Sequence, residues 1–136
     1  MSGLEAAPVD QTSAPWCSSS ANDIEGVENL PLFQTPDPNS GAENTPLIID
    51  LCGVSSAAGV AANYVWPNGQ TDGFLPNKEE LDLLFDQQEL LNLTDATYWS
   101  SSERSEAFAW SHEHPPGGLI VDFKEFSHRT RSIRAF

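Results

Sequence analysis

YWSSSE, at Tyr98–Glu103, sets two large aromatic side chains beside three serines at the start of the β-rich third of the chain. Rings and small polar residues alternate over 97–100 and over 107–111, and a period of two is typical of strands. A turn-rich domain needs large rings to fill its interior, so we interpret Tyr98 and Trp99 as core residues that fix a strand. The sequence therefore predicts a small sheet built around this stretch.

Two more strands are predicted on the C-terminal side of YWSSSE. LIVDF, at 119–123, is rich in the β-branched and aromatic residues that strands favour. HPPGG, at 114–118, is interpreted as a turn at the tip of a hairpin before that strand. SIRAF, at 132–136, supplies a last short strand. The region 97–136 is thus predicted to be the β part of the fold.

The clearest helix precedes YWSSSE. Asn77 is a good N-cap after Pro76, and Glu80 follows three residues later, as in a capping box. We expect this helix to continue to about residue 89. Its apolar stripe consists of Leu81, Leu84 and Phe85.

Two shorter helices are predicted upstream. Thr45 can serve as an N-cap, with Pro46 at the first helical position, where a missing N–H costs nothing, and Gly53 ends this helix. A second helix is expected at 56–64, where small and apolar residues recur every three or four positions. The helical part of the fold is therefore predicted to span 44–90.

The N-terminal region, 1–43, is predicted to be an extended arm followed by a long loop. A short apolar start favours a strand or arm within 1–20, and 21–43 is rich in Asn, Asp, Pro and Gly. TPDPNSG, at 35–41, consists of turn-forming residues throughout. Because 136 residues is an ordinary domain size, we expect one domain, 1–136, with a single core.

The chain is strongly acidic: Asp and Glu outnumber Lys and Arg by 20 to 6, giving a formal charge of −14. Such a surface repels nucleic acid and anionic membranes, so neither is expected as a partner. No apolar run approaches the length of a membrane span, so no membrane insertion is expected. The acidic residues either keep the protein soluble or bind a cation. Calcium stays open as a cofactor although no EF-hand loop is present, and no other cofactor is indicated.

Cys17 and Cys52 are the two cysteines of the chain. Neither has a CxxC neighbour or a histidine nearby in sequence, which disfavours zinc. Two alternatives remain, a pair of buried thiols or one disulfide. We favour the disulfide, because loop-rich proteins of outer surfaces use such cross-links.

No catalytic motif is found in the sequence. The serine run at 100–102 lacks the glycine-flanked elbow of a hydrolase. His112, His114 and His128 could act as bases, but no partner stands at a distinctive spacing, so we interpret them as ordinary loop histidines. HEH, at 112–114, offers two ligands on one face of a strand, and two ligands bind a metal only weakly. The sequence therefore predicts a protein that is not an enzyme.

Polar side chains in the C-terminal third are the best candidates for ligand binding, because loops on a rigid scaffold usually carry binding. Five of the six basic residues also fall in this third. The binding candidates are Arg104, Glu106, Ser111, His112, Glu113, Lys124 and His128. The candidates for the structural core are Trp16, Leu81, Leu84, Tyr98, Trp99, Trp110 and Phe136.

Several motifs, in their order and spacing, resemble the Lcl C-terminal domain family, which was formerly a domain of unknown function and has a C-type-lectin-like fold. They are FLPNKEELDLL (74–84), YWSSSE (98–103), AW (109–110) and RSIRAF (131–136), with GLEAAPVDQTSAPW (3–16), GAENTPLI (41–48) and the cysteine positions also matching. The resemblance covers nearly the whole chain. It implies an α+β fold in which two helices flank a small, twisted antiparallel sheet and long loops form one face.

Two features depart from the family pattern. Family members usually begin with a Gly-rich segment and an apolar strand before the GLEAA-like motif, whereas this sequence starts at that motif. It is therefore either a fragment or takes the missing first strand from a partner chain. HPPGG also replaces a shorter polar turn after AW, which weakens the transfer of any ligand site from the family.

The resemblance implies adhesion, since such domains lie at the tips of bacterial surface or phage proteins and bind glycans or host surfaces. We expect a non-catalytic binding module at a bacterial cell surface or phage virion surface that recognises a glycan or host surface molecule through loops in 103–130. A homo-oligomer is expected, with a trimer among the options. The start, MSGLEAAPVD, lacks the features of a signal peptide, so an extracellular location requires an upstream export signal or, for a virion, lysis. The charge of −14 makes a polyanionic ligand less favourable.

Two other functions are weighed against this expectation. A structural virion protein, such as a capsid decoration or fibre-tip protein, would interact mainly with other subunits of its own particle, using 1–43 against a neighbouring chain. An enzyme related to the formylglycine-generating branch of the same broad fold would need reactive cysteines, and a disulfide between Cys17 and Cys52 would tie both of them up.

Overall fold

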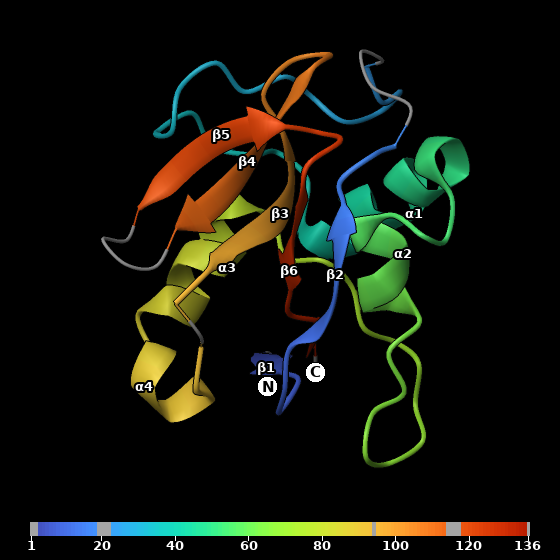
Figure 1. Cartoon of the computed structure of the whole chain (residues 1–136), viewed down its shortest axis with the longest axis vertical. Coiled ribbons are helices and arrows are strands. Elements are labelled where there is room, and N and C mark those ends of the chain that lie inside the picture. Colours follow the sequence, from blue (N-terminus) through green and yellow to red (C-terminus); the bar gives the residue numbers. More distant parts are fainter. Residues whose placement is uncertain (1–2, 19–22, 94, 114–117, 136) are drawn as a thin grey trace.

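The computed structural model of the chain describes residues 3–18, 23–93, 95–113 and 118–135. They form an α+β fold with an open sheet: two helices lie beside one end of the sheet, and a third lies behind its middle strands (Figure 1). The helices are α1 (Gly41–Cys52), α2 (Ala57–Ala62), α3 (Lys78–Phe85) and α4 (Gln88–Leu91). The strands are β1 (Leu4–Ala6), β2 (Gln11–Pro15), β3 (Thr97–Glu103), β4 (Phe108–Glu113), β5 (Leu119–Phe123), β6 (Ser127–Thr130) and β7 (Ile133–Ala135).

The main sheet has five strands in the order β2-β6-β3-β4-β5, and β1 pairs with β7 in a separate two-stranded sheet. The prediction of a purely antiparallel sheet is wrong, because β3 and β6 run parallel and meet where Tyr98 faces Arg129. The prediction of two flanking helices is also too simple, since the described residues contain four. The coarse α+β class is confirmed.

The first helix begins earlier than predicted. Its N-cap is Ser40, whose hydroxyl accepts from the Glu43 N–H while the Glu43 carboxylate accepts from the Ser40 N–H, completing a capping box. Thr45 is instead buried inside α1, and its Oγ1 accepts from the Leu75 N–H at 3.0 Å. Pro46 lies within the helix rather than at its start. A capping box satisfies two N–H groups and therefore outweighs the Thr-Pro signal.

The N-terminus of α3 was correctly predicted. Asn77 is the N-cap, and Glu80 completes its capping box. Glu80 also connects two helices: its Oε1 accepts from Asn77 N at 2.8 Å and from Gly41 N, the first residue of α1, at 3.0 Å. Gly41 must approach closely, since a Cβ there would lie 2.3 Å from the Leu75 carbonyl oxygen. The helix ends at Phe85, short of the predicted residue 89, and the one-turn α4 follows.

Stability should decrease as pH rises through the titration of Glu80. Burial raises the pKa of its carboxyl above the ordinary 4.5, although hydrogen bonds from Asn77 and Gly41 oppose this. Between pH 4.5 and the raised pKa the folded chain binds more protons than the unfolded chain, so the free energy of unfolding falls as pH increases and then levels off. Urea denaturation at a series of pH values should give a shallower fall for Glu80→Gln than for wild type. Parallel curves for the two proteins would contradict this assignment.

The side chains of Tyr98 and Trp99 are fully buried and point to opposite faces of β3. The buried hydrophobic residues accordingly form two clusters rather than the single core predicted. One contains Trp99 and Trp16 with residues of α1 and α2, and the other contains Tyr98 with residues of α3. All of the predicted core residues are buried except Phe136, which lies outside the described residues: these are Trp16, Leu81, Leu84, Tyr98, Trp99 and Trp110.

The serines of YWSSSE are buried and connect β3 to its surroundings. The Ser100 hydroxyl donates to the Trp110 carbonyl at 2.7 Å, and the Ser102 hydroxyl donates to the Asp37 carboxylate at 2.7 Å. Asp37 also accepts from Asn39 N and from the Asn44 side chain, both at 3.0 Å. These bonds fix the predicted turn TPDPNSG against β3.

Several predicted elements are present with changed bounds. The N-terminal arm carries β1 and β2, the helix expected at 56–64 is α2 with Ser56 as its N-cap, and the last strand is β7. Strand β3 continues through the serines to Glu103, and β6 was not predicted. The predicted HPPGG turn covers 114–118, of which 114–117 lie outside the described residues. No helix of the described residues is both long and apolar enough to cross a membrane.

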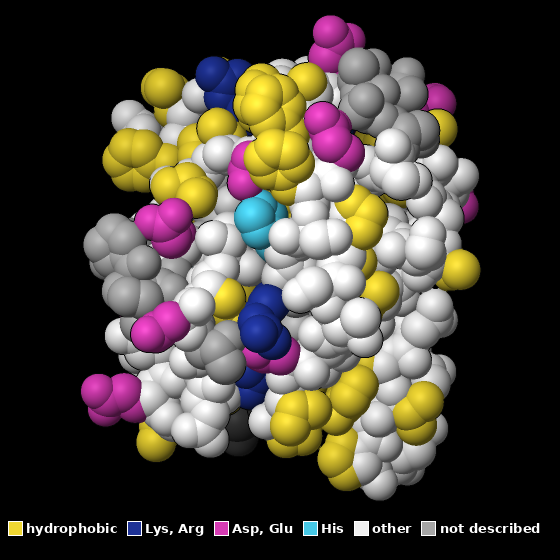
Figure 2. All heavy atoms as spheres, viewed as in Figure 1, with side chains coloured by type: hydrophobic (Ala, Val, Ile, Leu, Met, Phe, Trp, Pro, Cys, Tyr) yellow, Lys and Arg dark blue, Asp and Glu magenta, His cyan; other side chains and the backbone are white. Residues whose placement is uncertain are grey.

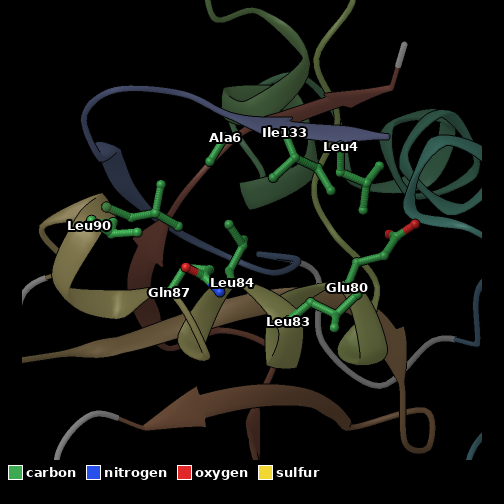
Figure 3. A pocket seen from close by; sticks show the side chains of 9 residues that line it. Leu4, Ala6, Glu80, Leu83, Leu84, Gln87, Leu90 and Ile133 are labelled. Carbon is green, nitrogen blue, oxygen red and sulfur yellow. The ribbon is translucent and has the colours of Figure 1, made fainter. Parts of the chain in front are cut away.

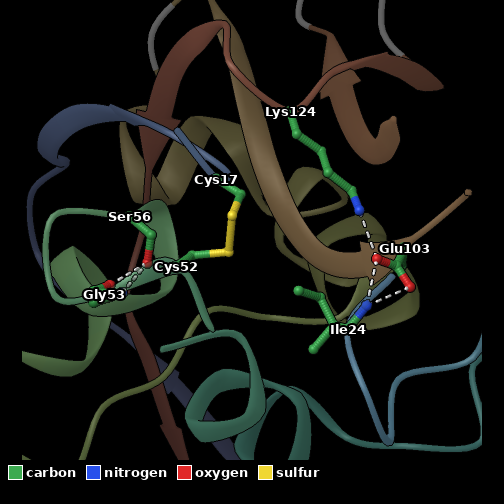
Figure 4. Close-up of a disulfide and its surroundings, with 8 residues drawn as sticks. Cys17, Ile24, Cys52, Gly53, Ser56, Glu103 and Lys124 are labelled. Carbon is green, nitrogen blue, oxygen red and sulfur yellow. Dashed lines mark hydrogen bonds and ion pairs between the residues drawn. A yellow bond between two sulfur atoms is a disulfide. The ribbon is translucent and has the colours of Figure 1, made fainter. Parts of the chain in front are cut away.

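The predicted disulfide between Cys17 and Cys52 is confirmed (Figure 4). It joins the residue that follows Trp16 to the last residue of α1, and both half-cystines belong to the Trp16–Trp99 cluster. The two cysteines are 35 residues apart in the sequence, and the loop that the bond closes contains the long N-terminal loop and α1.

Candidate binding site

Three phenylalanines form an aromatic surface where β4 and β5 meet the turn that follows. Phe108 and Phe123 are direct cross-strand partners with ring centroids 4.6 Å apart, and Phe126 lies 5.4 Å from Phe123. Phe123 and Phe126 are 42% and 48% exposed, which is unusual for rings that already contact one another. We call Phe108, Phe123 and Phe126 the aromatic ledge.

The ledge lies at the upper edge of the molecule as drawn in Figure 1. Figure 2 shows hydrophobic side chains gathered at the top of this face, over the end of β5, with acidic side chains and a basic side chain at their border. Apolar rings bordered by polar groups can bind a ligand that has both apolar and polar faces.

Two turns hold the ledge in place. In the β5–β6 turn, Phe126 N donates to the Phe123 carbonyl at 3.1 Å, and Lys124 N donates to the Ala107 carbonyl at 3.1 Å. The second of these bonds connects it to the β3–β4 turn, where Arg104 N and Ser105 N both donate to the Phe108 carbonyl. The two turns therefore form one surface, which lies within the predicted binding region 103–130.

Lys124 anchors the ledge from inside the protein. Its side chain is fully buried and its ammonium lies 2.6 Å from the Glu103 carboxylate, which is also fully buried (Figure 4). The ammonium stands 4.8 Å from the centroid of the Trp16 ring, within cation–π range. Glu103 also accepts from Ile24 N at 3.1 Å. This buried pair connects the turn that carries Phe123 and Phe126 to β3 and to the long N-terminal loop.

Burial is the largest influence on the Glu103 carboxyl and raises its pKa, while the Lys124 ammonium and Ile24 N oppose the shift. Lys124 was predicted to bind ligand. Its burial and its ion pair leave it no access to one, so its contribution to the site is to position the ledge.

Arg104 and Glu106 lie in the β3–β4 turn next to the ledge, Arg104 half-buried and Glu106 exposed. The bonds from Arg104 N and from the neighbouring Ser105 N to the Phe108 carbonyl fix the backbone of this turn.

His128 lies on β6 and is half-buried. Its Nε2 is 2.7 Å from the Asp122 carboxylate, and its ring meets the Trp99 ring edge-on with centroids 4.7 Å apart. Asp122 precedes Phe123 on β5, and successive side chains of a strand point to opposite faces, so this polar pair belongs to the face of β5 opposite the Phe123 ring.

The remaining predicted residues lie elsewhere. Ser111 is fully buried and donates to the Ile120 carbonyl at 3.3 Å. His112 is buried at the other end of β4 from Phe108, stacked on Phe85 at 3.7 Å and hydrogen-bonded to Asp82. Glu113 ends that strand and is half-buried. The structure therefore does not bring the seven predicted residues together in one site.

No group of three or more His, Cys, Asp or Glu suited to a metal ion occurs within 3–18, 23–93, 95–113 and 118–135. His112 and Glu113 of the HEH motif belong to this range, whereas His114 lies outside the described residues.

The aromatic ledge itself was missed. The sequence analysis interpreted LIVDF as a typical strand and did not single out Phe123 or Phe126. The available signal was the pair of phenylalanines at 123 and 126, since a ring within the tight turn FKEF cannot continue the alternation of the strand.

No family model matches this chain, and no curated protein matches it either.

Proposed function

We propose that this protein is a non-catalytic binding module that recognises a glycan through the aromatic ledge and its polar neighbours. The exposed pair Phe123 and Phe126 is the observation that supports this proposal most strongly. Saccharide rings have an apolar face of C–H groups that stacks on aromatic rings, and hydroxyl groups at their rim that bind polar side chains. Arg104 and Glu106 offer such polar groups in the turn next to the ledge.

The distribution of charge supports a neutral glycan rather than a sulfated one. Five of the six Lys and Arg side chains already form an ion pair with a carboxylate: Lys78, Lys124, Arg129, Arg131 and Arg134. The sixth, Arg104, lies in the β3–β4 turn next to the ledge, on a chain of formal charge −14. A polyanion would meet repulsion over most of this surface.

A location at a bacterial cell surface or virion surface belongs to the same proposal. The Cys17–Cys52 disulfide supports it, since disulfides persist in oxidising surroundings. An oligomer, including a trimer, would increase the avidity of a weak single site.

Replacing Phe126 with alanine should weaken glycan binding about tenfold, equivalent to about 1.4 kcal/mol, because one stacking ring is lost. A panel of immobilised neutral and sulfated saccharides measures this directly. Neutral saccharides should be retained by the wild-type protein and lost by Phe126→Ala. Phe33→Ala removes another exposed ring, 62% exposed on the long N-terminal loop, and should change nothing.

Retention of sulfated saccharides alone, equal binding by Phe126→Ala and Phe33→Ala, or no binding to any member of the panel would each overturn the proposal.

A structural virion protein is the second candidate function. The exposed leucines Leu83 and Leu90 favour it, because a subunit interface would cover them.

A further inference from the structure

An apolar groove of about 550 Å³ lies between the β1–β7 pair and the helices α3 and α4 (Figure 3). It is remote in the fold from the aromatic ledge, at the end of the molecule where β1 lies in Figure 1. Its apolar lining comes from β1, α3, α4 and β7: Leu4, Leu83, Leu84, Leu90, Leu91 and Ile133.

The floor of the groove belongs to the core, but its walls do not. Leu84 and Ile133 are buried in the Tyr98 cluster. Leu83 and Leu90, by contrast, are 59% and 80% exposed, and Leu83 lies outside the apolar stripe of α3. Exposed leucines that converge on one groove cost stability in water unless a partner covers them.

Carboxylates stand in and beside the groove. Glu80 is part of its lining, and the exposed Asp86 and Glu89 lie next to Gln87 and Leu90, which also line it. Lys78 is the one basic residue of 78–93, and its buried ammonium donates to the Phe33 carbonyl and pairs with Glu79. The helical wall therefore offers negative charge around an apolar strip.

We propose that this groove binds a cationic amphipathic segment of a partner protein, with its apolar side chains against Leu83 and Leu90 and its Lys and Arg residues facing the carboxylates. Charge decides between the occupants. A second copy of this chain would bring its own −14 to the same surface, whereas a basic segment gains attraction at the rim and hydrophobic burial in the groove. The inference goes beyond glycan recognition and does not rest on it.

The test uses a synthetic amphipathic peptide of about 18 residues made of Leu and Lys, long enough to form a helix on a surface. A second peptide with the same number of lysines has Gln in place of Leu. Fluorescence anisotropy should show binding of the Leu/Lys peptide at least about tenfold tighter than that of the Gln/Lys peptide.

Matched variants locate the site. Leu83→Gln/Leu90→Gln should weaken binding of the Leu/Lys peptide about tenfold, whereas Val54→Gln/Val65→Gln, which changes two exposed valines away from the groove, should leave it unchanged. All four side chains are exposed, so both variants are expected to fold, and circular dichroism checks this.

Equal affinity for the two peptides, or equal affinity of the two variants for the Leu/Lys peptide, would overturn the proposal, because the peptide would then bind without specificity for the groove.

Sedimentation equilibrium tests the other possible occupant, a second copy of this chain. A dimer that Leu83→Gln/Leu90→Gln abolishes would assign the groove to a second copy and also overturn the proposal. Glycan binding by Phe126→Ala is independent of these outcomes, so the two proposals can fail separately.

Discussion

Substituting Lys124 with methionine should lower the free energy of unfolding by about 3–5 kcal/mol. Methionine has a similar length but leaves the fully buried Glu103 carboxylate without its cation, 2.6 Å away in the wild-type protein. Among the described residues, the carboxylate would retain the hydrogen bond from Ile24 N, and the cation–π contact between Lys124 and Trp16 would be lost. An unpaired charge is expensive in a site that excludes water.

Urea denaturation measures this loss of stability, and two further variants serve as controls. Arg129→Met removes the cation of an ion pair at 3.7 Å whose arginine is 45% exposed, and should cost less than about 1 kcal/mol. Glu103→Gln/Lys124→Met keeps an acceptor for Ile24 N without leaving a charge, so it should recover part of the stability.

Lowering the pH should also reduce the difference in free energy of unfolding between Lys124→Met and the wild-type protein. Burial already raises the pKa of Glu103, and without the ammonium that opposes this shift the pKa rises further. The variant then gains stability as the pH falls and the carboxyl is protonated. A loss below about 1 kcal/mol that does not vary with pH would mean that the pair does not anchor the turn.

Removing the disulfide by Cys17→Ser/Cys52→Ser should cost about 4 kcal/mol on the chain-entropy estimate. The bond spans 35 residues, so its absence releases a long segment of the unfolded chain. Because that segment supplies Ile24, which bonds to Glu103, the loss also reaches the support of the ledge. Against an ordinary stability of about 5–15 kcal/mol, a loss of this size is large.

Thermal unfolding of the wild-type protein with and without a reducing agent offers a second measurement of the same contribution. The reducing agent and the Cys17→Ser/Cys52→Ser substitution should lower the midpoint of thermal unfolding to a similar degree. An unchanged midpoint in the double serine variant would show that the loop is held by Asp37 and the hydrophobic clusters without the cross-link.

Local signals in the sequence predicted part of the fold. Asn77 and Glu80 form a capping box whose partners stand three residues apart, so a short window contains the whole interaction. Tyr98 and Trp99 were correctly placed inside because large rings in a loop-rich chain have few other positions.

The parts that depend on distant partners were not predictable in this way. Lysine is a residue type that is usually exposed, and the burial of Lys124 depends on Glu103, 21 residues away, which supplies the opposite charge. The parallel pairing of β3 with β6 likewise joins residues without a local signal. In the candidate site, Arg104 and Glu106 were proposed from their loop position and remain a prediction. Phe123 and Phe126 were not singled out, because their exposure depends on how the turn after β5 is placed in the fold.

Two-dimensional NMR of the labelled protein, titrated with the saccharide that the panel retains best, tests the central claim that the aromatic ledge is the glycan site. The account predicts that chemical-shift changes concentrate in 104–108 and 119–128, around Phe108, Phe123 and Phe126, and leave α3 and α4 unchanged. Shift changes confined to the groove at Leu83 and Leu90, or no changes at saturating saccharide, would contradict it.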